Sequence, residues 1–108
     1  MYEPAITKHF LRQLKRLTKK DKNLKHTLTS VLSDFDKNRN ISIGNSVYKV
    51  RIKKNSRGKS AGYRLYLYII EIENMLAPIC IFPKSRKEDI TYAELTYHIE
   101  KVKAELLG

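Results

Sequence analysis

Apolar side chains recur every three or four residues in two stretches of the first forty residues. This spacing gathers them on one face of an α-helix. The first stretch predicts a helix from Thr7 or Lys8 to Lys19, and the second predicts a helix capped at its N-terminus by Asp21. We expect the two apolar faces to pack against each other in an antiparallel hairpin, which ends at the polar residues 36–40.

The middle of the chain has the pattern of β-strands. Residues 47–53 alternate between apolar and cationic side chains, whereas residues 63–72 are rich in aromatic and β-branched side chains. Residues 75–82 predict a third antiparallel strand, in which Pro78 requires a bulge or an edge position because proline has no N–H to donate. Residues 41–46 carry a Gly-Asn turn signal and are expected to be a connector.

The two ends of the chain complete the predicted fold. A last helix should start at Thr91, which forms a Thr-x-x-Glu capping box with Glu94, and residues 3–7 can supply a short leading strand. Helices kept apart from a run of strands favour an α+β domain. We expect two N-terminal helices on a mostly antiparallel sheet of three to four strands, then a C-terminal helix. The length favours one domain over residues 1–108.

The chain carries a formal net charge of +11, and this charge is unevenly distributed. Residues 41–70 contain seven Lys and Arg residues and no Asp or Glu. Such a balance favours an anionic partner, which can be nucleic acid, a membrane surface or an acidic protein. In the first strand, alternation places Lys49, Arg51 and Lys53 in a row on one face and the apolar residues on the other.

Further cations are expected near this row. Arg64 opens the second strand, where we expect it to be exposed on the same concave face, and the loop after the third strand should lie beside it. Cations among tyrosines suit single-stranded nucleic acid, because cations bind phosphates and rings stack on bases. The alternative is a basic surface with no ligand, although like charges on neighbouring strands repel. The loop between the first two strands contributes Lys59, and the loop after the third strand contributes Lys84, Arg86 and Lys87.

Several other kinds of chemistry lack the residues they need. The chain has no Walker loop, no HExxH motif and no Cys–His cluster, so we expect no metal and no cofactor. Cys80 lies in an apolar run and is expected to be a buried structural thiol. The N-terminus lacks the pattern of a signal peptide and no apolar run reaches the ~18 residues that span a bilayer. We therefore expect a cytoplasmic protein that does not enter membranes.

Catalysis by the cations alone is chemically feasible. The 2′-OH of RNA can attack the adjacent phosphate while cations stabilise the charge that builds on the phosphoryl oxygens. A lysine crowded by other cations has a lowered pKa, which lets it exchange a proton near neutral pH. Carboxylates are few and lie mostly on the C-terminal helix, so we expect no acid–base pair of carboxylates in the cationic region.

The segments YKVRI, GKSAGYRLYLYI and IFPKSRKEDIT, preceded by the basic helical segment FLRQLKRLTKKD, resemble a known family. They are similar to the RelE/ParE superfamily of type II toxin–antitoxin toxins, closest to the RelE-like branch. The resemblance implies a small bacterial toxin that cleaves mRNA, usually in the ribosomal A site, through a metal-independent 2′-OH attack. It also implies a cognate antitoxin, through which alone operator DNA would be contacted.

The resemblance assigns roles to individual residues. It implies that Arg64, the arginine of GYR, binds phosphate and acts in catalysis, and that Lys49 and Arg51 match the basic residues of the preceding strand. Either of those two residues is a candidate proton acceptor. Arg86 matches a basic residue after the third strand, with Lys84 as the alternative. The predicted catalytic residues are Lys49, Arg51, Arg64 and Arg86, and the predicted substrate-binding residues are Lys53, Lys59, Lys84, Lys87 and Tyr92.

Other functions stay open on the sequence alone. A ParE-like toxin would inhibit gyrase and cleave no RNA, but that branch does not need the cationic sheet face. A non-catalytic basic protein would bind RNA or the ribosome with steep salt dependence and leave the RNA uncut. An inactive toxin would have the same overall pattern. Of these functions, the cationic strands favour the ribonuclease.

Overall fold

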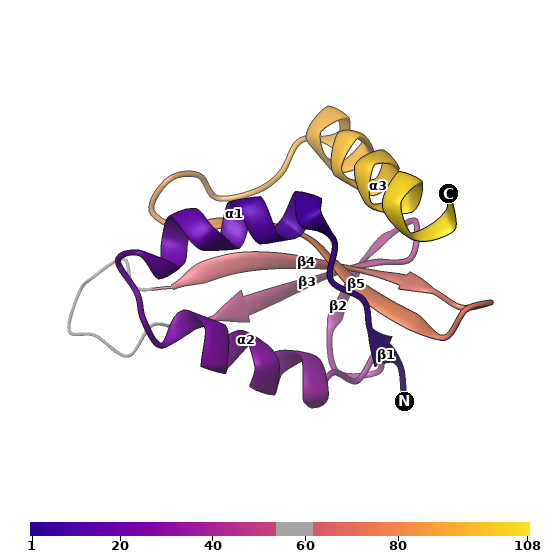
Figure 1. Ribbon diagram of the computed structural model, residues 1–108, viewed down its shortest axis with the longest axis horizontal. Helices are drawn as coiled ribbons and strands as arrows, with labels where there is room; N and C mark the ends of the chain where they lie inside the picture. The colour runs from indigo at the N-terminus through magenta and orange to yellow at the C-terminus, as the bar shows by residue number, and fades with distance from the viewer. Residues whose placement is uncertain (54–61) are drawn as a thin grey trace.

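The computed structural model describes residues 1–53 and 62–108, and this part of the chain has the predicted α+β architecture (Figure 1). Two N-terminal helices and a C-terminal helix surround one sheet of five strands, one more than the sequence indicated. The helices are α1 (Lys8–Thr18), α2 (Leu24–Ser33) and α3 (Tyr92–Leu107), and the strands are β1 (Glu3–Pro4), β2 (Ile41–Gly44), β3 (Val47–Ile52), β4 (Tyr63–Ile70) and β5 (Met75–Pro83).

The sheet is mostly antiparallel, as expected. Its strand order is β1-β5-β4-β3-β2, and only the short β1 runs parallel to its neighbour. The expectation of a plain connector over residues 41–46 was wrong, because β2 pairs with β3 through Ile41↔Lys49 and Ser42↔Tyr48. Asn45 and Ser46, with φ values of 55° and 62°, then form the tight turn. Four residues are too few to give a clear strand pattern.

Pro78 produces the bulge that the sequence predicted. Tyr66 pairs with Cys80 and Leu67 pairs with Pro78, so Ile79 is the extra residue on β5. β5 itself lies inside the sheet, because β1 pairs with the first two residues of its outer side. The proline is therefore accommodated at a bulge, in a part of β5 that has no strand partner among the described residues on the side away from β4.

Beyond β1, the side chain of Gln13 on α1 takes the place of a neighbouring strand. Its amide nitrogen donates to the carbonyl of Ile79 at 3.0 Å, and its amide oxygen accepts from the N–H of Ile81 at 3.1 Å. The primary amide thus forms the same pair of hydrogen bonds that a peptide group would form. This contact completes the β5 edge and fixes α1 against it.

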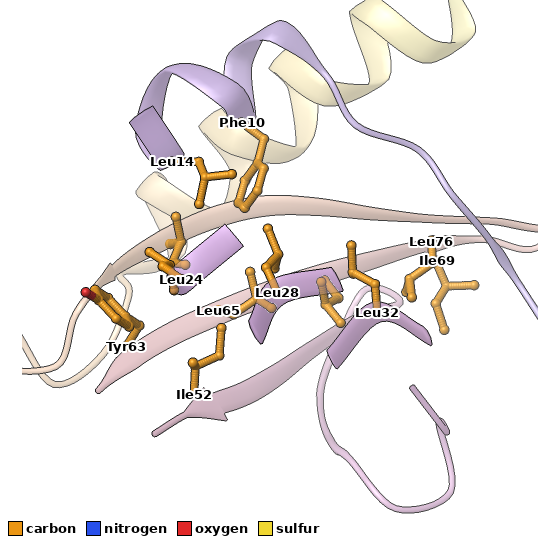
Figure 2. Close-up of a cluster of buried hydrophobic side chains, with 12 residues drawn as sticks. Phe10, Leu14, Leu24, Leu28, Leu32, Ile52, Tyr63, Leu65, Ile69 and Leu76 are labelled. Atoms are coloured by element: carbon orange, nitrogen blue, oxygen red, sulfur yellow. The ribbon is translucent and has the colours of Figure 1, made fainter. Parts of the chain in front are cut away.

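The apolar faces of α1 and α2 both pack on the sheet (Figure 2). The two helices also contact each other, as the expected hairpin requires, and their apolar side chains share one core with the sheet. Asp21 is not the N-cap of α2, since the N-cap residue is Asn23, which makes no side-chain capping bond. The Asp21 carboxylate accepts the Asn23 N–H at 3.2 Å through one oxygen and the Tyr63 hydroxyl at 2.9 Å through the other. The central residues of this core are Phe10, Leu14, Leu24, Leu28, Leu32, Leu65, Leu67 and Ile69.

Helix α3 covers part of the other face of the sheet. Leu95 and Val102 pack there against Tyr66, Ala77 and Ile79. The predicted capping box is present, with both of its hydrogen bonds formed. No helix in the described residues is long and apolar enough to cross a membrane.

Two contacts fasten α3 to the start of α1. The carboxylate of Glu105 accepts the backbone N–H groups of Lys8 at 2.7 Å and His9 at 2.9 Å, which satisfies two free donors at a helix N-terminus. The rings of His9 and His98 share a hydrogen bond of 2.7 Å. The C-terminal helix is therefore held by polar contacts as well as by its apolar face.

Candidate active site

Strand alternation and register bring three of the predicted cations to one face of the sheet. Arg51 on β3 is directly opposite Arg64 on β4, and Lys49 is opposite Tyr66. The alternate residues of β3, including Val50 and Ile52, pack into the helical core on the other face. The predicted division of β3 into one apolar face and one cationic face is therefore confirmed.

Arg64 is buried, with 7% of its surface exposed, so our expectation of an exposed Arg64 was wrong. It lies on a central strand, between Arg51 on β3 and Phe82 on β5. Its Nε and Nη1 atoms are inaccessible to solvent and have no hydrogen-bond partner in the described structure. Leaving buried donors unpaired is costly, so an anionic oxygen that reached these N–H groups would bind them favourably.

A carboxylate lies among these cations, which the sequence did not predict. Asp89, in the loop between β5 and α3, accepts a hydrogen bond from the Tyr66 hydroxyl at 2.5 Å and from the N–H of Ile90 at 2.9 Å. Its second oxygen is 3.7 Å from the Lys49 ammonium. Lys49 is largely buried, with 19% of its side chain exposed, whereas the Asp89 side chain is 62% exposed.

These contacts shift the pKa values of both partners in the Tyr66–Asp89 pair. The hydrogen bond from Tyr66 lowers the pKa of Asp89, and the Ile90 N–H and the positive charges of Lys49 and Arg64 act in the same direction. Burial raises the pKa of Tyr66, and its bond to Asp89 raises it further. At neutral pH, Asp89 is therefore an anion and Tyr66 a neutral donor.

The loop after β5 starts beside the β3–β4 end of the sheet, as expected. The N–H of Lys84 donates to the carbonyl of Gly62 at 3.0 Å, and both Lys84 and Arg86 are exposed. Lys87 is less available than predicted, because it pairs with Glu94 and its ammonium lies 4.8 Å from the centre of the Phe82 ring. Such a contact between a cation and an aromatic ring is attractive. Lys87 thus helps to hold the loop in place.

Arg86 and Lys87 also line a cavity of about 210 Å³ between α1, β5 and α3, together with Cys80 and His98. Cys80 is buried, as predicted, and burial raises the pKa of its thiol to about 12. This thiol is therefore protonated at neutral pH and is not a nucleophile. No group of three or more His, Cys, Asp or Glu side chains within residues 1–53 and 62–108 is arranged to hold a metal ion.

The remaining predicted site residues lie at the margins or outside the described residues. Lys53 is exposed just after β3, and Tyr92 is the first residue of α3, 75% exposed. Lys59 lies outside the described residues. Nothing in the local sequence pattern singles out Tyr66 or Asp89. Only the cross-strand register and the course of the loop bring these two side chains together.

Comparison with known families identifies the fold. The model of the family described as RelE toxin of the RelE/RelB toxin–antitoxin system matches residues 6–107. The chain belongs to the RelE toxin family. The resemblance seen in the sequence is therefore confirmed over nearly the whole chain, and the protein is a type II toxin–antitoxin toxin.

Solved structures of RelE proteins have the same fold. A chain of the intact E. coli RelBE toxin–antitoxin complex is 24% identical, with a TM-score of 0.53, and the match covers 77% of this chain and 96% of that one. A double arginine-to-alanine mutant of E. coli toxin RelE in the free state is 22% identical, with a TM-score of 0.54, and the match covers 91% and 97%. No curated protein matches the sequence at a significant level.

Proposed function

We propose that this RelE-family toxin is an endoribonuclease that cleaves mRNA on the ribosome and so inhibits translation. The observation that carries the proposal is the arrangement around Arg64. A buried guanidinium with two unpaired nitrogens lies beside Arg51 and on the same sheet face as Lys49. In a polyanion, the groups that fit such donors are phosphate oxygens.

The reaction needs only the groups named here. The 2′-oxygen of one ribose bonds to the adjacent phosphorus, and the bond from phosphorus to the 5′-oxygen of the next nucleotide breaks. The products are a 2′,3′-cyclic phosphate and a 5′-hydroxyl. Arg64 and Arg51 stabilise the charge that develops on the phosphoryl oxygens. An arginine stays protonated in proteins, so Lys49 is the better candidate to accept the 2′-hydroxyl proton and to return a proton to the departing 5′-oxygen.

Loop cations extend this surface along the RNA. Lys84 and Arg86 are exposed after β5, and Lys53 is exposed at the end of β3. In the proposed complex they bind phosphates on either side of the cleaved bond, and Tyr92 offers an exposed ring for a base. These residues set the position of the RNA, whereas the chemistry takes place at Arg64.

The proposal includes a partner protein. A toxin with a net charge of +11 is matched by an acidic antitoxin, and RelE of E. coli is known in complex with RelB. We propose that a cognate antitoxin binds this chain in the cytoplasm through an amphipathic helix with acidic residues. A short neighbouring reading frame is where its sequence is expected.

Mapping mRNA 5′ ends after expression of the toxin in bacteria tests this function. The wild-type protein should create new 5′ ends within translated messages, and Arg64→Ala should create none. Arg39→Ala is the matched control, because Arg39 is exposed and pairs only with Asp36 among the described residues. New ends from Arg64→Ala at the wild-type level would refute the proposed site. Growth arrest by the wild type without new ends would favour a gyrase inhibitor.

A further inference from the structure

We propose that the Asp89 carboxylate occupies the place of an RNA phosphate in the free toxin, so that the substrate must displace it from the sheet cations. This inference rests on the proposed function, because it concerns the regulation of the same site. Asp89 would act as an internal competitor of the substrate, and the loop between β5 and α3 would move when RNA binds.

The contacts of Asp89 are those that a phosphate oxygen would make. One carboxylate oxygen accepts from the hydroxyl of Tyr66 at 2.5 Å and from the N–H of Ile90, and the other lies 3.7 Å from the Lys49 ammonium. Tyr66 and Lys49 are cross-strand neighbours on the face that carries Arg64. An anion is therefore already held by the surface that we assign to the scissile phosphate.

Asp89 satisfies this surface only in part. The Nε and Nη1 atoms of Arg64 have no hydrogen-bond partner in the described part of the chain, although the guanidinium is buried. A carboxylate has two oxygens, of which one is already shared by Tyr66 and Ile90. A phosphodiester that reaches deeper can accept from Arg64 as well. The natural substrate thus offers the site more hydrogen bonds than the internal carboxylate does.

The position of Asp89 allows it to leave. Its side chain is 62% exposed, and its distance from Lys49 is that of a loose ion pair. The neighbouring residues Glu88 and Lys84 are exposed too, while Lys87 and Thr91 anchor the loop on the helix side. Displacing this ion pair, in which Lys49 is largely buried and Asp89 is exposed, should weaken substrate binding by up to roughly fivefold.

The test compares Asp89→Asn with Glu88→Gln. Asparagine keeps the acceptor for Tyr66 and Ile90 but removes the charge. Glu88→Gln removes the same charge from the adjacent exposed residue, for which the described structure gives no side-chain bond. The probe is a fluorescein-labelled single-stranded RNA with 2′-O-methyl riboses, which blocks cleavage. Fluorescence anisotropy at one fixed salt concentration should show that Asp89→Asn binds roughly three- to fivefold more tightly than the wild type, and clearly more tightly than Glu88→Gln.

A second pair of variants keeps the test decisive if Asp89→Asn unfolds. Asp89→Ser and Glu88→Ser remove the same two charges and replace each side chain with a smaller polar one. The inference predicts tighter RNA binding by Asp89→Ser only. Equal or weaker binding by Asp89→Ser relative to Glu88→Ser, or by Asp89→Asn relative to Glu88→Gln, would overturn it.

The two proposals fail in different ways. If the wild-type toxin produces new mRNA ends but Asp89→Asn binds RNA no more tightly than Glu88→Gln, Asp89 is not a competitor and the nuclease proposal stands. If the wild type produces no ends, while Asp89→Asn binds more tightly than its control, the carboxylate does compete for an anion site and the nuclease proposal falls.

Discussion

Arg64 is the residue on which the proposed site depends, and its surroundings are unfavourable for the stability of the free protein. Its guanidinium is buried beside Arg51 and Phe82, with two nitrogens that have no partner among the described residues. A buried charge without paired hydrogen bonds is destabilising. Residues of this kind are retained when a ligand supplies the missing partners.

Replacement of Arg64 by an apolar residue of similar length should therefore stabilise the protein. We expect Arg64→Met to raise the free energy of unfolding by about 1–3 kcal/mol, because the unpaired donors are removed. Growth inhibition should be lost at the same time. Urea unfolding followed by circular dichroism measures the change, with Arg51→Met as an exposed control expected within about 0.5 kcal/mol of the wild type. A clear loss of stability in Arg64→Met would show that the guanidinium has a structural partner.

For individual residues, the sequence predicts which cations lie on the same face of the sheet, but it does not predict how deeply each one is buried. The alternation of β3 places Lys49 and Arg51 on one face by backbone geometry alone. The burial of Arg64 depends on β4 lying between two strands, which is a property of the whole sheet. The contact of Asp89 with Tyr66 spans 23 residues and an irregular loop, so no local pattern reveals it.

Among the secondary-structure elements, β5 depends on a side chain for part of its pairing. Gln13 bonds to the backbone of Ile79 and Ile81 where β1 no longer reaches. This contact replaces a strand with a single residue of α1. It also gives the carbonyl of the bulged residue Ile79 a hydrogen-bond partner on the side of β5 away from β4.

Removal of the Gln13 amide should destabilise the fold. Gln13→Ala leaves a partly buried carbonyl and N–H of β5 without their partners, which costs about 1–3 kcal/mol. The free energy of unfolding from urea titration provides the measurement. Arg12→Ala, at the adjacent exposed position of α1, should change it by less than about 0.5 kcal/mol. Equal effects of the two substitutions would mean that Gln13 is not part of the sheet edge.

The contact between α1 and α3 should make stability depend on pH. Burial lowers the pKa of His98 to about 4 from 6.5, and the charge of His9 contributes. His98 therefore binds a proton more readily in the unfolded chain than in the folded one. Its contribution to the free energy of unfolding is complete above about pH 6.5 and is lost as the pH falls towards 4. The pKa of Glu94 is lowered from 4.5 to about 2, so its own contribution is lost only at lower pH.

Urea unfolding at several pH values between 7 and 4.5 tests this dependence, because the contribution of His98 changes in this range and that of Glu94 changes below it. We expect wild-type stability to fall over this range and His98→Gln, which cannot be protonated, to show a shallower decrease. His26→Gln is the control, since His26 is exposed on α2. Identical slopes for wild type and His98→Gln would contradict the account.

The sequence predicted the long elements and the short leading strand, but it did not predict β2. The periodicity of α1 and the capping box of α3 are local signals, and both are confirmed. The local pattern of residues 41–44 predicts a connector, because these residues form a strand only through their pairing with β3. Asp21 has the residue type of a helix cap, but the helix starts three residues later, and the carboxylate binds the Asn23 N–H and the Tyr63 hydroxyl.

At the scale of the whole molecule, charge should govern the binding of RNA. The chain has a net charge of +11, and Lys84, Arg86 and Arg51 are exposed near one end of the sheet. Each phosphate neutralised releases counterions, so affinity falls with salt. Positive charge also speeds the encounter with a polyanion such as the ribosome.

The salt dependence of RNA affinity distinguishes cations that contact phosphates from cations that only add to the net charge. Arg51→Gln should reduce the slope of log K against log salt concentration by about 0.7, the value for one phosphate contact with a single strand. Anisotropy titrations of a labelled, uncleavable RNA at several salt concentrations give this slope. Arg39→Gln should leave it nearly unchanged. If both variants reduced the slope equally, binding would depend on net charge and not on the sheet face.

Single-turnover cleavage of an mRNA positioned on purified ribosomes tests the central claim most directly. The wild-type toxin should cut the message, Arg39→Ala should cut it at the wild-type rate, and Arg64→Ala should be slower by roughly 100-fold or more, the effect expected when a donor to developing charge is lost. Cleavage by correctly folded Arg64→Ala at the wild-type rate would contradict the assignment of catalysis to this face of the sheet.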